Sequence, residues 1–249
     1  MKSKLKGMVL TKKEEELLHY LHAVKVSSYQ RIKRDIYPSY HIRSVCNRIY
    51  RLEDNHLVRG ECNRSINGGE RTLSLTNKGF TEYVAQGIES RSELSSESVL
   101  HDLNLGDIRS RLLKAKKVSS YYTENQIQTW GISGFERRFT SYVNLNSDAM
   151  VEIQFSSGNQ LIPLELEMHL KAKDRYEQLL KRYYQRDDVV LILYICANQN
   201  ILNKVREMEM TLFKSEQPKF LYKLKQDFDA DAYLEFTNCN GKSLRLDNP

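Results

Sequence analysis

Residues 148–168 read DAMVEIQFSSGNQLIPLELEM and contain two strand-like segments joined by a short polar turn at residues 156–159. In the second segment, apolar and acidic residues alternate strictly after its proline. Successive side chains of a strand point to opposite faces of a sheet, so Glu165 and Glu167 share one face and the apolar residues beside them share the other. The stretch therefore predicts a β-hairpin that carries two carboxylates on one face.

The sequence around this hairpin predicts an α/β domain. The expected elements are helices at residues 98–117, 172–186 and 201–213 and strands at residues 188–196, 219–225 and 232–237. The run at 188–196 is nearly continuously apolar, which is typical of a strand covered on both faces of its sheet. Residues 87–98, GIESRSELSSES, lack any period and predict a linker. We therefore expect the α/β domain to span residues 99–249.

Three carboxylates of this domain indicate a metal site. Asp148 opens the first strand of the hairpin, and Glu165 and Glu167 lie on the second. Oxygen ligands of this kind hold Mg²⁺, which in phosphodiester hydrolysis orients water and stabilises the charge that develops on phosphate. We expect Asp148 and Glu165 to bind the metal, Glu167 to assist catalysis, and Lys171 to orient the attacking water. The alternative is that both glutamates form the solvated face of an edge strand.

Positive charge is concentrated in the first third of the chain. The 249 residues carry 38 Lys and Arg against 32 Asp and Glu, a formal charge of +6. Residues 1–83 hold 16 of the basic and 9 of the acidic residues, a net charge of +7, and the rest of the chain has a net charge of −1. This asymmetry is typical of proteins that bind a polyanion, either nucleic acid or a membrane surface. A basic domain without such a partner is the alternative.

Composition and local sequence argue against several classes of protein. Hydrophobic residues make up 40% and charged residues 28%, which excludes a wholly disordered chain. The longest apolar run, residues 189–197, is far shorter than the roughly 20 residues of a membrane span. The N-terminus lacks an apolar signal-peptide core, so we expect a cytoplasmic protein with no membrane partner. No CxxC pair, Walker loop, Gly-x-Ser-x-Gly elbow or dinucleotide fingerprint is present.

Three helical segments follow one another in the first third. The first begins at Thr11, which forms a capping-box pattern with Glu14. A short second helix is expected at residues 29–36. A third is expected to start from a Ser39 cap and to end at about residue 55.

A basic hairpin is expected after the third helix. Its strands are predicted at residues 57–60 and 71–76, and Asn67-Gly68-Gly69 supplies residues that tolerate the positive φ of a hairpin tip. Three helices followed by a hairpin is the order of a winged helix-turn-helix, whose third helix enters the DNA major groove. We therefore predict such a domain over residues 8–86. A winged helix used for protein–protein contact is the alternative.

Candidate DNA-binding side chains gather on one face of the third helix and on the hairpin. Arg and Asn suit guanine and adenine edges, and Arg also suits phosphates. The candidates are Tyr40, His41, Arg43, Ser44, Asn47, Arg48 and Arg51 on the helix and Arg59, Arg64 and Arg71 on the hairpin.

The second domain resembles the PD-(D/E)xK nuclease-like core. Both have a helix, an Asp-led strand, a turn, a strand with paired acidic residues, a helix and an apolar strand. Asp148 and Glu165 match the acidic positions of the family, but Glu167 stands where its lysine is usual. The resemblance implies that Lys171 or Lys173 replaces that lysine, or that the site binds metal without turnover or is inert.

The whole chain resembles the replication-relaxation family of plasmid and mobile-element proteins over about residues 8–195. The motifs that carry the resemblance are Leu10-Thr-Lys-Lys-Glu14, Val26-Ser-Ser-Tyr29, Arg48-Ile-Tyr-Arg-Leu52 with Leu57-Val58, Leu100-His-Asp-Leu-Asn-Leu-Gly-Asp-Ile108, and Leu164-Glu-Leu-Glu167. The resemblance implies an N-terminal winged helix, a nuclease-like domain, and a role in plasmid DNA relaxation or replication.

These observations lead to three functional hypotheses. The first is a sequence-specific double-stranded DNA-binding protein of a mobile element or phage-related system, which regulates transcription or replication. The second is a Mg²⁺-dependent, site-specific DNA endonuclease or nickase that uses the carboxylates. The third makes the second domain an oligomerisation or docking module, because winged-helix regulators often bind paired half-sites as dimers. Its partners would then be a second copy of the chain or other mobile-element proteins.

Overall fold

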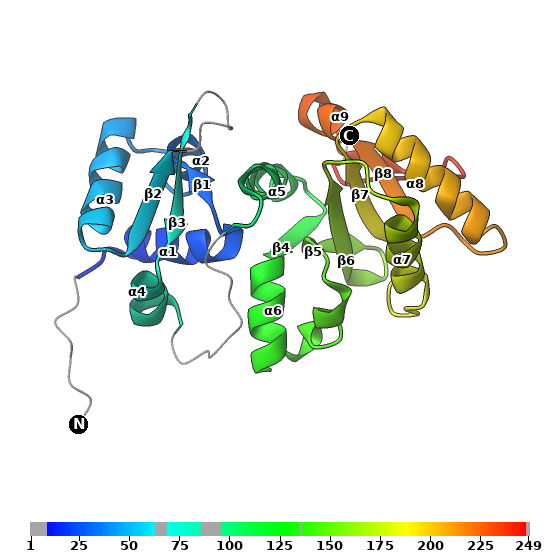
Figure 1. The fold of residues 1–249 in the computed structure, drawn as a ribbon, viewed down its shortest axis with the longest axis horizontal. Coiled ribbons are helices and arrows are strands. Elements are labelled where there is room, and N and C mark those ends of the chain that lie inside the picture. Colours follow the sequence, from blue (N-terminus) through cyan, green and yellow to red (C-terminus); the bar gives the residue numbers. More distant parts are fainter. Residues whose placement is uncertain (1–8, 63–68, 86–95, 135, 248–249) are drawn as a thin grey trace. The chain divides into compact units, whose positions relative to one another are not determined.

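The computed structural model describes residues 9–62, 69–85, 96–134 and 136–247 (Figure 1). The chain divides into two compact units. The N-terminal unit comprises residues 1–110 and 125–141, and the C-terminal unit comprises residues 111–124 and 142–249. Together they form a mixed α and β architecture. Among the described helices, none combines the length and the apolar character that crossing a bilayer requires.

Helices and a small antiparallel sheet form the N-terminal unit. Its first elements are α1 (Lys12–Val24), β1 (Ser27–Ser28), α2 (Tyr29–Asp35), α3 (Ile42–Asp54), β2 (Val58–Cys62) and β3 (Arg71–Leu75), and the strand order is β1-β3-β2. The expected capping box starts α1, because the Glu14 carboxylate accepts the Thr11 N–H at 2.8 Å and the Thr11 hydroxyl accepts the Glu14 amide. The apolar stripe of α3, Val45, Ile49 and Leu52, is fully buried in the core of this unit.

The start of α3 differs from the prediction. His41, not Ser39, is the N-cap, and its side chain accepts the backbone N–H of Arg43 at 3.3 Å. The chain turns just before this cap, where the Tyr40 amide donates to the Tyr37 carbonyl at 3.0 Å. Tyr40 and His41 therefore precede the helix and do not lie along its face.

The expected hairpin is confirmed for its described part. β2 and β3 pair antiparallel, with Val58 opposite Leu75 and Cys62 opposite Arg71. Gly69 has a φ of 101°, as a glycine near the tip requires. Asn67, Gly68 and Arg64 lie outside the described residues. A short helix, α4 (Asn77–Gly79), and a π-helical turn, η1 (Phe80–Val84), follow the hairpin.

A seven-stranded mixed sheet forms the C-terminal unit. Its strands are β4 (Val118–Thr123), β5 (Ala149–Phe155), β6 (Gly158–Glu167), β7 (Ile192–Cys196), β8 (Phe220–Leu224), β9 (Glu235–Thr237) and β10 (Ser243–Arg245), in the order β10-β9-β8-β7-β6-β5-β4. β6, β7 and β8 are parallel, and the outer strands pair antiparallel.

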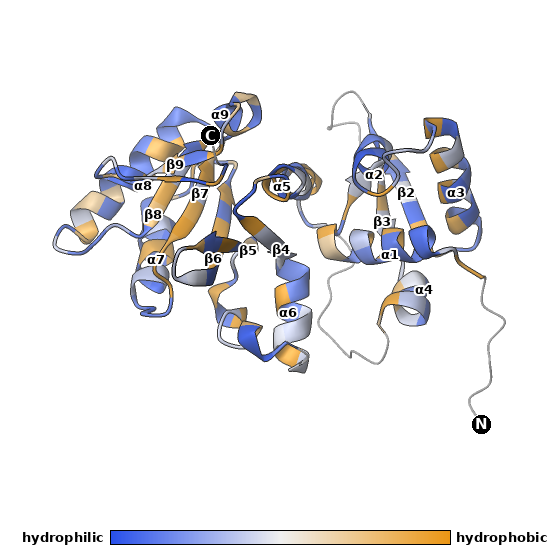
Figure 2. Cartoon of the chain, turned by 180° about the vertical axis from the view of Figure 1, so that it is seen from behind, coloured by the Kyte–Doolittle hydropathy of each residue, from blue (hydrophilic) through white to orange (hydrophobic). Residues whose placement is uncertain are grey.

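Two helices connect the parallel strands and cover one face of the sheet. α7 (Lys173–Tyr184) follows β6, and α8 (Gln199–Leu212) follows β7. Tyr176 and Leu180 of α7 pack in one cluster with Val205 of α8 and with Tyr194 and Phe220 of the sheet. Every residue of β7 is buried, as its apolar run indicated, but the strand begins at Ile192 and not at residue 188 as predicted. Figure 2 shows hydrophobic residues concentrated along β7 and β8.

Several predicted bounds need correction. The hairpin β5–β6 is confirmed, whereas the helix predicted at 98–117 ends earlier, as α5 (Val99–Leu112). β4, α6 (Glu124–Ser133) and β10 were not predicted. The strand β4 shows no regular alternation of apolar and polar residues, because its pairing with β5 shifts register between Val118 and Ser120. The remaining elements are the 3₁₀ turns η2 (Arg137–Phe139) and η3 (Val143–Leu145) and the short helix α9 (Lys225–Ala230).

The division into units also differs from the predicted boundary at residues 87–98. Residues 99–110 of α5 belong to the N-terminal unit, where the Asp107 carboxylate accepts hydrogen bonds from Arg31 and Arg34 of α2, each at 2.7 Å. Ser110 donates to Asp35 at 2.9 Å in the same way. Since these contacts depend on side chains about 75 positions apart, a composition shift could not reveal them.

Candidate nucleic-acid interface and carboxylate site

The N-terminal half of α3 and its cap present a polar, exposed surface. His41, Arg43, Ser44 and Asn47 are all exposed. Within the part of the chain that the structure describes, the Arg43 guanidinium forms no ion pair. The structure therefore brings together four of the ten predicted DNA-binding residues in a cluster open to solvent, which we call the α3 cluster.

Arg48 and Arg51, further along α3, bind a carboxylate of the same unit. Glu14 is fully buried, and one of its oxygens accepts from Arg51 and lies 3.7 Å from Arg48 Nη1. Burial acts to raise the pKa of Glu14, but the hydrogen bonds from Thr11 and Arg51 outweigh burial and hold that pKa below its ordinary value. These two arginines thus join α3 to the start of α1.

Tyr40 supports one of these arginines. The guanidinium carbon of Arg48 lies 5.2 Å from the centre of the Tyr40 ring, within the range of a cation–π contact. The same ring packs edge-on against Tyr37, with centroids 5.3 Å apart. Tyr40 is therefore placed to hold Arg48 within the unit.

The described arginines of the hairpin also have acidic partners. Arg59 lies 3.0 Å from Glu61 in a solvent-exposed pair. Arg71 binds Glu53 of α3 at 2.6 Å and lies over the Tyr50 ring. Arg71 therefore fastens the hairpin to α3.

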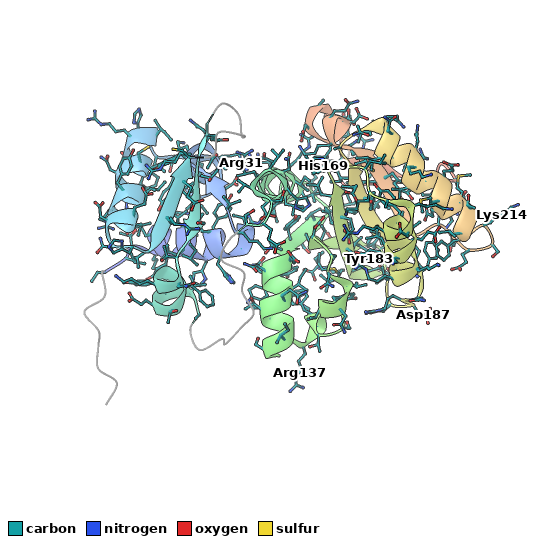
Figure 3. The ribbon with its side chains drawn as sticks, viewed as in Figure 1. Arg31, Arg137, His169, Tyr183, Asp187 and Lys214 are labelled. Atoms are coloured by element: carbon teal, nitrogen blue, oxygen red, sulfur yellow. The ribbon has the colours of Figure 1, made fainter. Side chains whose placement is uncertain are left out.

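In the C-terminal unit, Asp148 and Glu165 come together at the start of β5 and on β6. Asp148 accepts the backbone N–H of Leu166 at 2.7 Å, and Glu165 accepts from the hydroxyl of Tyr183. Burial and the nearby Asp148 charge raise the pKa of the Glu165 carboxyl to about 8. Figure 3 labels Tyr183, which α7 contributes to this site.

Glu167 and Lys171 form a second pair beside the first. Glu167 is only 4% exposed, and its carboxylate lies 2.9 Å from Lys171 Nζ and 3.4 Å from the Tyr194 hydroxyl. Lys173, the other candidate for the missing lysine, pairs instead with Glu177 at 3.6 Å. Lys171 is thus the lysine that reaches the predicted carboxylates.

The alternative of a solvated edge strand is wrong. β6 lies between β5 and β7 inside the sheet, and the Glu165 side chain is only 12% exposed. Carboxylates are seldom buried to this extent without partners, and Glu165 and Glu167 both have hydrogen-bond or ion-pair partners.

A Mg²⁺ ion is often held by one or two carboxylates, with water and substrate phosphate completing the shell. Asp148 and Glu165 fit that limited role. Across the described residues, no group of three or more His, Cys, Asp or Glu side chains is placed to hold a metal ion.

Sequence reasoning missed the partners that α7 and β7 supply. In the sequence, Tyr183 falls in the helix predicted at residues 172–186 and Tyr194 in the apolar run at 188–196, and neither pattern indicates a carboxylate partner. Their hydroxyls contact Glu165 and Glu167, respectively. A tyrosine at a predicted helix–sheet contact opposite a carboxylate is the signal that could have indicated these contacts.

Comparison of the chain with family models, with curated proteins and with solved structures finds no match in any of the three.

Proposed function

We propose that the protein is a sequence-specific double-stranded DNA-binding protein of a mobile element or phage-related system, and that it regulates transcription or replication. In this proposal the N-terminal unit is a winged helix-turn-helix domain with α3 as its recognition helix. The observation that carries the proposal is the α3 cluster, an exposed group that includes Arg43 and Asn47. The rest of the helix is held to its unit by ion pairs. The resemblance to the replication-relaxation family supports the mobile-element setting.

The division of roles along α3 supports this function. Arg48 and Arg51 bind Glu14, and Arg71 binds Glu53, so the helix is fixed by contacts at several points. A rigid element places base-reading side chains more precisely than a loop does. The exposed Arg43 and Asn47 are the residue types that make bidentate contacts with guanine and adenine in a major groove.

The test is selection of bound sequences from a random duplex pool, followed by affinity measurements on the selected site. Arg43→Ala and Asn47→Ala should each lose about 1–3 kcal/mol of discrimination and relax the preference at one base position. Arg137→Ala is the matched control, because Arg137 is an exposed arginine of the same unit outside α3 (Figure 3). An unchanged selected sequence and affinity in Arg43→Ala would exclude α3 as the recognition helix.

A second candidate function is a Mg²⁺-dependent DNA endonuclease or nickase with a PD-(D/E)xK-like site. The specific observation in its favour is the meeting of Asp148 and Glu165 on the paired strands β5 and β6. Burial and the nearby Asp148 charge raise the pKa of Glu165 there, and a divalent cation would offset the repulsion between the two carboxylates. The bound ion would stabilise the charge developing on the phosphate. Glu167 and Lys171, which form an ion pair with each other, would lie next to the two metal ligands.

This candidate is tested by incubating supercoiled plasmid that contains the selected site with Mg²⁺ or Mn²⁺. We expect nicking by the unchanged protein, a large loss of nicking in Glu165→Ala, and no loss in Glu207→Ala, which removes an exposed carboxylate of α8. Equal nicking by both variants, or none by the unchanged protein, would exclude it.

A further inference from the structure

A basic recess of about 380 Å³ occurs in the C-terminal unit. The end of β6, the following loop and α7 line it, and its charged and polar side chains are Glu167, Lys171, Arg175, Gln178 and Arg182. Arg175, Gln178 and Arg182 recur at helical spacing, so α7 presents them on one face. The DNA-binding surface on α3 and the Asp148–Glu165 pair do not account for this concentration of cations.

The charges in the recess do not cancel. Lys171 and Glu167 compensate each other, since they lie 2.9 Å apart. Arg182 Nη2 forms an ion pair with Glu165 at 3.8 Å, too long for a hydrogen bond. Arg175 is exposed and has no ion-pair partner among the residues that the structure describes. Arg175 is therefore left without a carboxylate, and the ion pair of Arg182 with Glu165, which is not hydrogen-bonded, leaves guanidinium donors from which an anion can accept.

We propose that this recess binds a phosphate monoester, and that the ligand is the phosphorylated end of a DNA strand. A monoester carries a charge of about −1.5 to −2 at neutral pH and offers three acceptor oxygens to the donors of Arg175 and Arg182, whereas a phosphodiester within a strand carries only one negative charge. Guanidinium groups bind phosphate oxygens through paired, charge-assisted hydrogen bonds. The choice of DNA as the carrier of the phosphate rests on the proposed DNA-binding function.

The experiment measures binding of the full chain to one duplex prepared in three forms, with a 5′ phosphate, with a 3′ phosphate or with hydroxyl ends only. EDTA is present throughout, so that no divalent ion bridges protein and phosphate. One phosphorylated form should bind about tenfold more tightly than the hydroxyl form, as expected for one or two hydrogen bonds to a charged group. Arg175→Ala and Arg182→Gln should each reduce that difference to about twofold or less.

The matched control is Lys181→Ala, which removes an exposed cation of the same helix that does not line the recess. It should keep the full preference for the phosphorylated end. Circular dichroism of each variant checks that α7 still folds, and Arg175→Lys, which keeps the charge but not the paired donors, should recover part of the preference.

The outcomes separate this inference from the proposed function. Equal affinity for all three duplexes, or a preference that survives in Arg175→Ala, overturns the recess as a phosphate site and leaves DNA binding in place. If no duplex binds, the proposed function and the DNA carrier are both overturned. Competition supports the inference if a phosphorylated oligonucleotide displaces the labelled duplex at far lower concentration than inorganic phosphate, and overturns the DNA carrier if the two compete equally.

Discussion

Replacing Glu14 by alanine should strongly destabilise the N-terminal unit, although no expected functional residue is removed. The buried carboxylate accepts from the Thr11 amide at 2.8 Å, from the Thr11 hydroxyl at 2.9 Å and from Arg51. The variant removes the capping box and leaves Arg51 and Arg48 without their shared acceptor.

The magnitude follows from these contacts. Loss of a helix N-cap interaction costs about 1 kcal/mol. Loss of the charged hydrogen bond would cost about 1.5–3 kcal/mol in a buried site, and we take about 1 kcal/mol because the Arg51 side chain is 48% exposed. Removing the buried γ-methylene group adds about 0.8 kcal/mol. The expected loss in the free energy of unfolding is therefore about 3 kcal/mol, or roughly 10 °C or more in the melting temperature of a domain of this size.

Urea unfolding followed by circular dichroism, with thermal melts alongside, measures this loss. Glu15→Ala is the matched control, because Glu15 is the next residue of the same helix and is exposed. It should change stability by less than about 0.5 kcal/mol. Since the pKa of Glu14 is lowered on folding, its contribution is present above its unfolded pKa and is lost as the pH falls through the folded value. The difference between Glu14→Ala and the unchanged protein should therefore shrink in acid.

Equal stability of Glu14→Ala and Glu15→Ala would refute the claim that Glu14 fastens α3. Arg48 and Arg51, which remain candidates for DNA contact, would then not depend on Glu14 for their placement. Arg51→Ala gives an independent check, because it should lower stability by about 1 kcal/mol, whereas Arg43→Ala should leave stability unchanged.

Three further predictions concern the N-terminal unit. Gly79→Ala should destabilise the unit by about 1–3 kcal/mol in urea unfolding, although alanine favours helix, because a Cβ there would lie 2.3 Å from the carbonyl oxygen of Leu57. Asp107→Ala should reduce stability by about 1–2 kcal/mol and weaken its dependence on salt, because it removes the acceptor of two arginines of α2. Burial lowers the pKa of His22 to about 4, so the unfolded state takes up the proton first and stability should fall as the pH drops from about 6.5 to 4. His22→Leu should flatten that fall, and an unchanged pH profile would contradict the assignment to His22.

The sequence predicted those elements whose signal is local. The third helix, the capping box at Thr11 and the β5–β6 hairpin each follow a period or a short pattern, and each is present. The partners of the predicted site residues could not be foreseen in the same way. Arg51 meets Glu14 across 37 positions, and Tyr183 meets Glu165 across 18, because the packing of whole elements brings them together.

The hydrogen bonds between α2 and α5 have a practical consequence for experiments on fragments of the chain. A fragment cut at the predicted linker would keep Arg31 and Arg34 but lose Asp107, and it would also expose Val26, which packs against Leu103. Such a fragment should express poorly or melt early even if every residue proposed to contact DNA is intact. Because residues 125–141 also belong to the N-terminal unit, no single cut separates the two units cleanly. Substitutions in the whole chain, not truncations, are therefore the sound way to assign activities to either one.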